Sequence, residues 1–205
     1  MRINSFMLFT FAMFLLYACK EPTSSDTIAE KVKFPIAVVS TSLGEMYFWL
    51  FDETPMHKAK FMELAKNEHY NQFTFNRVVK NFVIQGGCPD LPQYFEDSPY
   101  LLDPEFIDSL KHTYGALGMG RDDNPGKQSN ACQFYIVNKE AGLANLDGNY
   151  MIFGKLIKGE DVLEAIEKVA TNTKDEPLTS LPLDVKIQEF SDQELLDSLG
   201  FSRMK

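Results

Sequence analysis

Phe75-Asn76-Arg77-Val78-Val79-Lys80-Asn81-Phe82-Val83-Ile84-Gln85-Gly86-Gly87 is the stretch on which the interpretation of this chain depends. It places a cation (Arg77), two apolar residues (Phe82 and Val83) and an amide (Gln85) on a β-rich run that closes with paired glycines. A lone arginine on a strand is usually a solvated surface residue. Arg77 becomes a candidate for a functional role only if the rest of the chain supplies segments that match this one.

Two later segments do match it in kind. The first is Ser129-Asn130-Ala131-Cys132-Gln133-Phe134-Tyr135-Ile136, and the second is Leu146-Asp147-Gly148, followed by Met151-Ile152-Phe153-Gly154-Lys155. In this order and at these separations, the three segments resemble the cyclophilin family of peptidyl-prolyl isomerases. The resemblance covers about residues 34–190, and the ordered set is more specific than any single segment.

The hydrophobic pattern and the turn signals predict a mainly β fold. Thr54-Pro55 opens a helix that runs to about Lys66, and a second helix is expected over about 161–169. Short strands are expected at 34–40, 45–51, 73–78, 83–85, 116–119, 133–137, 151–157 and 183–190. The resemblance implies that these elements form a closed eight-stranded antiparallel barrel capped by two helices. Its interior is packed with side chains, so the substrate groove is expected on the outer wall.

The resemblance also implies a reaction, the cis–trans rotation of X-Pro peptide bonds. The barrier is about 18–20 kcal/mol because the amide loses its resonance. Catalysis needs only a group that stabilises the twisted transition state more than the planar ground states, without nucleophile, metal or general base. By resemblance, Arg77 is the donor to the proline nitrogen and Gln85 orients it. The implied substrate-binding residues are Phe82, Val83, Gly120, Arg121, Gln133, Phe134, Tyr135, Leu146 and Tyr150.

The sequence departs from the family pattern at several of these positions. Gly120-Arg121-Asp122 stands where the family often has Ala-Asn-Ala, and an extra stretch, 123–127, follows it. Asn145 replaces a frequent tryptophan, so cyclosporin is expected to bind poorly. Val83 replaces a common methionine, and Tyr150 stands where a histidine is common. Binding is therefore expected to persist with a changed preference.

Composition argues against several other classes of function. The chain of 205 residues has 20 Lys and Arg against 29 Asp and Glu, a net charge of -9. An acidic chain without a basic stripe argues against a nucleic-acid partner. His57, His69 and His112 show no metal-ligand spacing, and Gly118-Met119-Gly120 lacks the third glycine of a dinucleotide-binding loop. No cofactor and no metal are expected.

The N-terminal residues indicate export and lipid attachment. An apolar run from Phe6 to Tyr17 is too short to cross a bilayer but fits a secretory signal. It ends in Leu16-Tyr17-Ala18-Cys19, which resembles the lipobox of bacterial lipoproteins. We therefore expect a signal peptide over 1–18, then a lipidated Cys19 and polar tether over 19–33. The alternative is a plain signal peptide with an incidental cysteine.

Location and partners follow from that interpretation. Lys20 is not the aspartate that retains many lipoproteins at the inner membrane. By resemblance, this places the chain in the bacterial cell envelope, anchored to the outer membrane, facing the periplasm or the cell surface. The expected partners are the lipid bilayer and proline-containing segments of unfolded or partly folded exported proteins.

The two other cysteines lie beside the family segments. Cys88 directly follows Gly86-Gly87, and Cys132 directly precedes Gln133. In an oxidising compartment they either form a disulfide or remain two small buried thiols.

The whole chain thus divides into the signal, the tether, an isomerase domain over 34–190 and a helical extension over 191–205. The extension has a capping box at Ser191-Asp192-Gln193-Glu194 and receives no function from the sequence. The leading hypothesis is a membrane-anchored prolyl isomerase for exported proteins. The alternatives are a module that grips proline-containing segments with little turnover, and a purely structural lipoprotein.

Overall fold

A computed structural model describes residues 32–95 and 98–203 of the chain. The strands are β1 (Lys33–Thr41), β2 (Gly44–Leu50), β3 (Thr74–Val78), β4 (Val83–Gly87), β5 (Leu101–Leu102), β6 (Ala116–Gly120), β7 (Ser129–Val137), β8 (Met151–Lys158) and β9 (Asp184–Ser191). The α-helices are α2 (Pro55–Lys66), α3 (Pro92–Phe95), α4 (Glu160–Glu167) and α5 (Asp192–Leu199), with short 3-10 turns η1 (His69–Gln72) and η2 (Ala144–Leu146). The predicted signal segment, Cys19 and nearly all of the tether lie outside the described residues.

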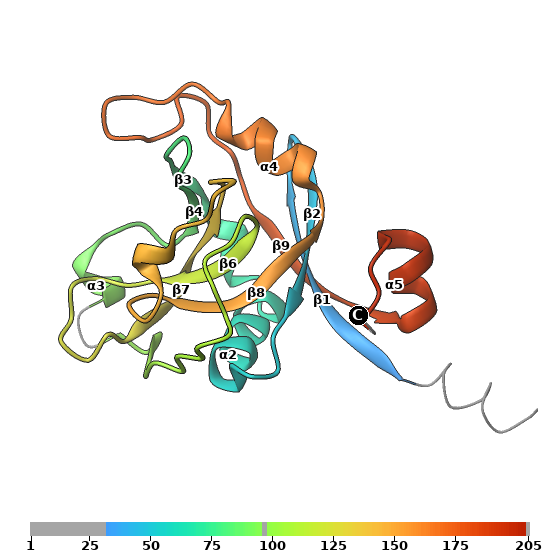
Figure 1. Ribbon diagram of the computed structural model, residues 1–205. Coiled ribbons are helices and arrows are strands. Elements are labelled where there is room, and N and C mark those ends of the chain that lie inside the picture. Colours follow the sequence, from blue (N-terminus) through green and yellow to red (C-terminus); the bar gives the residue numbers. More distant parts are fainter. Residues whose placement is uncertain (1–31, 96–97, 204–205) are drawn as a thin grey trace, which may run out of the picture.

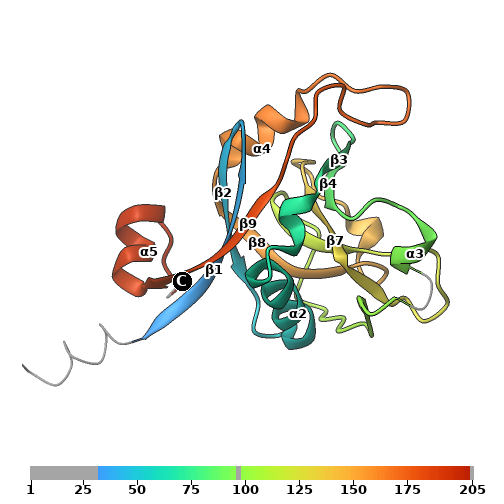
Figure 2. The same cartoon turned by 180° about the vertical axis from the view of Figure 1, so that it is seen from behind.

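The strands form one curled antiparallel sheet (Figures 1 and 2). Eight of them follow the order β3-β4-β7-β6-β8-β2-β1-β9, and the short β5 pairs with β7 beside this path. The mainly β fold, the antiparallel pairing and the helices predicted from the sequence are confirmed, with element ends shifted by a few residues. Among the described residues, no helix is long and apolar enough to span a membrane.

The sheet is an open half-barrel, whereas the sequence led us to expect a closed barrel. Its ends approach where Phe75 N donates to Leu181 O at 2.9 Å and Leu183 N donates to Phe73 O at 3.1 Å. Between those contacts, Thr74 and Pro182 form only an isolated bridge. Pro182 has no N–H to donate, so a regular ladder does not extend through this segment. Complete closure stays a prediction.

Aromatic side chains fill the concave interior of the sheet, where α2 packs. The ring of Phe61 on α2 lies 5.1 Å from Phe153, 5.0 Å from Tyr70 and 5.8 Å from Phe134, centroid to centroid. All four side chains are fully buried. The hydroxyl of Tyr70 donates to the carbonyl of Ala131 at 2.6 Å, which satisfies its one polar atom. The interior is therefore a packed core, and any substrate site must lie on the outside.

The helix α2 begins where the sequence predicted it, but its N-terminus is capped differently. The Thr54 side chain accepts no capping hydrogen bond. The carboxylate of Glu105 takes that place, accepting from Met56 N at 3.1 Å and His57 N at 3.0 Å. A carboxylate satisfies the free N–H groups and also interacts favourably with the helix dipole.

The helical extension α5 lies outside the curled sheet, beside β1 (Figures 1 and 2). Its capping box forms as predicted: Glu194 N donates to Ser191 Oγ at 3.3 Å, and Ser191 N donates to Glu194 Oε2 at 2.7 Å. Leu195 and Leu199 pack with Ile36 of β1 in a separate apolar cluster. Partly buried side chains surround that cluster, namely Phe34, Tyr47, Trp49, Ile157, Phe190 and Phe201. The extension thus covers the outer face of β1 and β2.

This packing predicts that α5 contributes to the stability of the whole domain. Leu195→Ala should lower the free energy of unfolding by about 2–4 kcal/mol because it leaves a cavity in a buried cluster. The matched control is Leu196→Ala on the same helix, whose side chain is 52% exposed and should change stability by less than about 0.5 kcal/mol. Urea unfolding followed by circular dichroism measures both values. Equal effects of the two substitutions would contradict the packing of α5 described above.

Candidate active site

A pocket of about 220 Å³ lies on the outer surface of the sheet. It is lined by Arg77, Phe82, Val83, Gln85, Asp90, Gly120, Arg121, Gln133, Tyr135, Leu146 and Tyr150. Every one of these except Asp90 was selected from the sequence. They come from β3, β4, β6, β7 and η2 and from loop residues close to the ends of β4, β6 and β8, segments widely separated along the chain. The fold therefore brings almost all of the predicted site residues to one place.

Phe134 is the predicted site residue that does not reach this pocket. Its side chain is fully buried in the central core, where its ring lies 5.8 Å from that of Phe61. Successive side chains on a strand point to opposite faces. Because Gln133 and Tyr135 face the pocket, Phe134 between them must face the interior. Phe134 is therefore not among the residues that the structure brings to this pocket.

A β-bulge directs Arg77 to the outside of the sheet. In the β3–β4 ladder Phe75 pairs with Gly86 and Arg77 pairs with Gln85, so one extra residue of β3, Asn76, is accommodated between them. Without the bulge, Phe75 and Arg77 would point to the same face. With it, Phe75 stays in the core while Arg77 lines the pocket. The Asn76 side chain donates to Gly87 O at 3.0 Å and holds the bulge in place.

The guanidinium of Arg77 has one acidic neighbour, Asp175 on the loop between α4 and β9. The Nη2–Oδ2 distance is 3.8 Å, and both side chains are more than one third exposed, 37% and 46%. Such an ion pair contributes little to stability. Val78 N donates to Asp175 O at 2.8 Å and fixes this loop beside β3. Gln85 pairs with Arg77 in the ladder, yet no hydrogen bond joins the two side chains in the described part of the chain.

The apolar part of the pocket is a notch, formed by Phe82, Val83, Tyr135, Leu146 and Tyr150. These five side chains belong to one apolar cluster, in which Val83 and Tyr135 are buried and the other three are partly buried. The Tyr135 and Tyr150 rings meet edge to face at 6.3 Å between centroids. The notch is thus an apolar recess whose rim is open to solvent.

Glycines on β6 make room for the side chains of the pocket. A methyl group at Gly118 would collide with the Tyr135 ring, and one at Gly120 would collide with the Gln133 amide. Both glycines lie on the strand paired with β7. The sequence selected Gly120 as a substrate contact, and the structure gives it this additional steric role.

The polar end of the pocket contains Gln133 and Asp90. Gln133 Nε2 donates to Asp90 Oδ1 at 2.7 Å and to Cys88 O at 3.0 Å. Cys88 and Cys132 are joined by a disulfide, with a Cα–Cα distance of 5.5 Å. Of the two alternatives that the sequence left open for these cysteines, the structure has the disulfide. The disulfide ties the segment carrying Asp90 to the strand carrying Gln133, so it holds the two groups within hydrogen-bonding distance.

A buried network lies behind Tyr135. Its hydroxyl lies 2.8 Å from His112 Nε2, and His112 Nδ1 lies 2.7 Å from Asp147 Oδ1. Burial lowers the pKa of His112 against the opposing effect of Asp147, and burial raises the pKa of Tyr135 well above its usual value. The imidazole is therefore neutral at neutral pH: Nδ1–H donates to Asp147, and Nε2 accepts from the tyrosine hydroxyl. This network fixes the ring of Tyr135 from behind.

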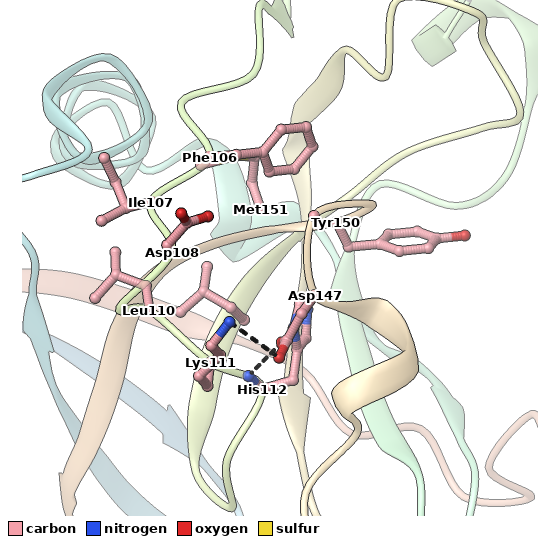
Figure 3. A pocket seen from close by; sticks show the side chains of 11 residues that line it. Phe106, Ile107, Asp108, Leu110, Lys111, His112, Asp147, Tyr150 and Met151 are labelled. Atoms are coloured by element: carbon pink, nitrogen blue, oxygen red, sulfur yellow. Dashed lines mark hydrogen bonds and ion pairs between the residues drawn. The ribbon is translucent and has the colours of Figure 1, made fainter.

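Figure 3 shows the His112 and Asp147 part of this network, where it lines a second, smaller cavity of about 40 Å³. Asp147 pairs there with His112 and, at 3.7 Å, with Lys111. Tyr150 lines both this cavity and the larger pocket. The two hollows are therefore neighbours that share the Tyr150 side chain as a wall.

Another buried arrangement, Glu105–His57–Ser129, has the residue types of a nucleophilic triad. His57 Nδ1 lies 2.6 Å from Glu105 Oε2, and Nε2 lies 3.1 Å from Ser129 Oγ. His57 and Ser129 are both completely buried, so no substrate reaches the hydroxyl. The Glu105–His57–Ser129 arrangement instead caps and anchors α2. Among the described residues there is no cluster of His, Cys, Asp and Glu that could hold a metal ion.

Comparisons with known proteins agree with this geometry. Residues 36–189 match the family model described as cyclophilin type peptidyl-prolyl cis-trans isomerase/CLD. The Arabidopsis thaliana protein "Peptidyl-prolyl cis-trans isomerase CYP18-1" is 37% identical over 146 residues, covering 70% of this chain and 89% of that protein. The Rhizopus delemar protein "Peptidyl-prolyl cis-trans isomerase-like 2" is 35% identical over 167 residues, covering 76% of this chain but only 29% of that protein.

A solved structure is also similar. The crystal structure of a cyclophilin type peptidyl-prolyl cis-trans isomerase from Cryptosporidium parvum, in the presence of the dipeptide Ala-Pro, has a TM-score of 0.66 and 27% identity. The match covers 75% of this chain and 98% of that one. The chain therefore belongs to the cyclophilin-type peptidyl-prolyl cis-trans isomerase family. It is an enzyme, an isomerase of X-Pro peptide bonds.

The buried histidines predict how stability depends on pH. Burial lowers the pKa values of His57, His69 and His112 in the folded chain. The unfolded chain then binds these protons at a higher pH, so this contribution to stability is complete at about pH 7.5 and is lost as the pH falls through about 6.5. The free energy of unfolding from urea titrations should therefore fall between about pH 7.5 and about pH 5.

His112→Gln should make this fall smaller, because one of the three groups no longer titrates. Glu105 and Asp147, whose pKa values are lowered by their histidine partners despite burial, act in the same direction only at more acidic pH. Stability that stayed constant or rose as the pH fell to about 5 would contradict the neutral, buried state of these histidines.

Proposed function

We propose that this enzyme accelerates X-Pro rotation in exported proteins, with Arg77 stabilising the twisted imide. One observation supports this most strongly: Arg77 and the apolar notch line the same outer pocket. A proline ring seated in the notch would lie with its amide nitrogen toward the strands that carry Arg77 and Gln85. The similar Cryptosporidium parvum protein was crystallised in the presence of Ala-Pro, a dipeptide of this class.

The proposed mechanism is electrostatic. As the imide twists, the proline nitrogen becomes pyramidal and its lone pair is freed from resonance. A guanidinium N–H that donates to this lone pair stabilises the transition state more than either planar ground state, which is the condition for catalysis. Arg is permanently charged and presents several donors in a rigid fork, so it can also hold a neighbouring carbonyl.

The magnitudes are sufficient for such an enzyme. A charge-assisted hydrogen bond contributes about 1.5–3 kcal/mol net. Transfer of the imide from water to an apolar recess favours the less polar twisted form and adds a similar amount. A thousandfold acceleration requires about 4 kcal/mol, which these two contributions together supply.

One observation supports a second candidate function, a module that grips proline-containing segments with little turnover. Gln85 makes no hydrogen bond to Arg77 among the described residues, and the nearest carboxylate, Asp175, lies 3.8 Å away. A guanidinium held this loosely is less well organised for catalysis than one fixed by a hydrogen bond to another side chain. We favour the enzyme because hydrogen bonds in ligand-free sites are often long and shorten only with substrate bound.

Kinetics of an arginine variant separate the two candidates. Arg77→Ala should lower kcat/KM for a short Ala-Pro peptide by about 100-fold, since it removes a charge-assisted hydrogen bond present in the transition state. Lys80→Ala removes the same charge from the exposed loop between β3 and β4, outside the pocket, and should leave the rate unchanged. A protease-coupled assay with circular dichroism as a folding check measures these effects. Full activity of Arg77→Ala, or binding without acceleration by the unmodified enzyme, would favour the module.

We also propose that the chain is a lipid-anchored protein of the bacterial cell envelope, and that its clients are exported proteins. The support is the sequence: an apolar run too short to span a bilayer, ending in Leu16-Tyr17-Ala18-Cys19. Several acyl chains on one cysteine anchor firmly where a single chain binds only marginally. Residues 19–33 would then connect the anchor to the domain, and Lys20 favours the outer membrane.

Substitution of the anchor cysteine tests this proposal. When the full chain is expressed in a lipoprotein-processing bacterium, Cys19→Ser should move it from the membrane fraction to the soluble fraction. Ser24→Ala in the same polar segment is the matched control and should leave the chain in the membranes. Mass spectrometry of the N-terminal peptide identifies the acyl groups directly. Unchanged membrane retention of Cys19→Ser would rule out the lipid anchor, while an unacylated N-terminus would indicate a plain signal peptide.

A further inference from the structure

Arg121 is a second guanidinium in the pocket, and its side chain is held unusually firmly for a partly exposed arginine. Nε donates to Asn149 O at 2.9 Å, and Nη1 donates to Asp122 O at 3.0 Å and to Asn124 O at 3.3 Å. The guanidinium carbon lies 4.8 Å from the centroid of the Tyr150 ring, a cation–π contact. All three acceptors are backbone carbonyls, so the position of the charge is fixed without being neutralised by a carboxylate.

The loop that carries Arg121 is itself well organised. Asn124 Oδ1 accepts from Gln128 N at 2.7 Å, while Asn124 Nδ2 donates to Gln128 O at 2.9 Å and to Asp122 Oδ1 at 2.7 Å. The Asp122 carboxylate is therefore engaged with Asn124 and not with Arg121. In the described part of the chain, no acidic side chain forms an ion pair with Arg121.

The other charges that face the pocket have partners of their own. Arg77 lies near Asp175, and Asp90 accepts a hydrogen bond from Gln133. Arg121 is thus the charged group of the pocket that has no acidic neighbour within ion-pairing distance among the described residues. A positioned, partly desolvated guanidinium is a preferred binding group for carboxylates.

The location of this charge specifies which part of a ligand it meets. The Tyr150 ring belongs to the apolar notch, and it also contacts the guanidinium of Arg121. Consecutive Cα atoms are about 3.8 Å apart, so with a proline in the notch the adjacent residues of the peptide lie within reach of the guanidinium. A carboxylate on such a residue would bind Arg121 without displacing the proline.

From this arrangement we infer that the pocket selects X-Pro segments that carry an acidic side chain within two residues of the proline. The inference rests on the proposed function, because it requires the peptide to occupy this pocket. Arg121 acts here as a specificity-determining residue, separate from the role proposed for Arg77. The net charge of -9 opposes acidic peptides at long range, so the preference arises from local contact with Arg121.

Isosteric peptides test the inference. In a series of short X-Pro peptides, Glu is compared with Gln at each of the two positions before and the two positions after the proline. At one position or more, kcat/KM for the Glu peptide should exceed that for the Gln peptide by about fivefold, the effect of one partly exposed ion pair. In Arg121→Gln this ratio should fall to about one.

Two further variants make the comparison specific. Lys127→Gln removes a charge from the same loop; its side chain donates to Gly148 O, and it does not line the pocket. It changes the long-range electrostatic field as Arg121→Gln does but leaves the Arg121 guanidinium in the pocket. The fivefold Glu-to-Gln ratio of kcat/KM should therefore persist. Arg121→Lys keeps a cation and should retain part of the fivefold Glu-to-Gln ratio. Its result separates loss of charge from disturbance of the loop.

The outcomes distinguish this inference from the proposed function. A Glu-to-Gln ratio of about one at every position in the unmodified enzyme, or a ratio unchanged in Arg121→Gln, would overturn the role of Arg121. Failure to accelerate any peptide would overturn the proposed mechanism instead. Titration calorimetry with the same Glu and Gln peptides then still decides the preference, because it measures binding alone.

Discussion

The outward placement of Arg77 depends on one irregularity of the backbone, the bulge at Asn76. A regular strand would place Phe75 and Arg77 on one face, so either the core would contain a buried guanidinium or Phe75 would be exposed to water. An unpaired charge in the core is far more costly than a small distortion of a ladder. With one extra residue in β3, Phe75 and Val78 stay in the core and Arg77 faces outward beside Gln85. β6 has register shifts of its own, between Leu117 and Gly118 against β8 and between Met119 and Gly120 against β7, beside the glycines that accommodate Tyr135 and Gln133.

Local patterns in the sequence were enough to predict most of the fold and most of the pocket. Helix α2, the strands and the ten predicted site residues that line the pocket all follow from short segments whose spacing is regular. The failures involve contacts between residues far apart in the chain. Glu105, not Thr54, caps α2, and Asp90 and Asp175 reach the site from loops that carry no signal of their own. Phe134 lies in the core instead of the pocket, because a segment match does not say which face of a strand a side chain occupies.

Three structural features surround the pocket. The hydroxyl of Tyr135 connects the apolar notch to a buried histidine and aspartate, the loop after Gly120 brings a fixed cation to the rim, and a disulfide joins the segments at the polar end. Each lies at a different part of the pocket: behind Tyr135, beside Tyr150 and at Gln133.

The placement of α5 has a consequence for how the domain is presented to other molecules. The first described strand, β1, begins beside α5, whereas β3, β4 and β7 lie at the other end of the domain (Figures 1 and 2). A chain held by its N-terminal side would therefore have its attachment point and its helical extension together, on the side remote from the pocket. The strands that carry Arg77, Gln85 and Gln133 would then be held at a distance from that attachment point.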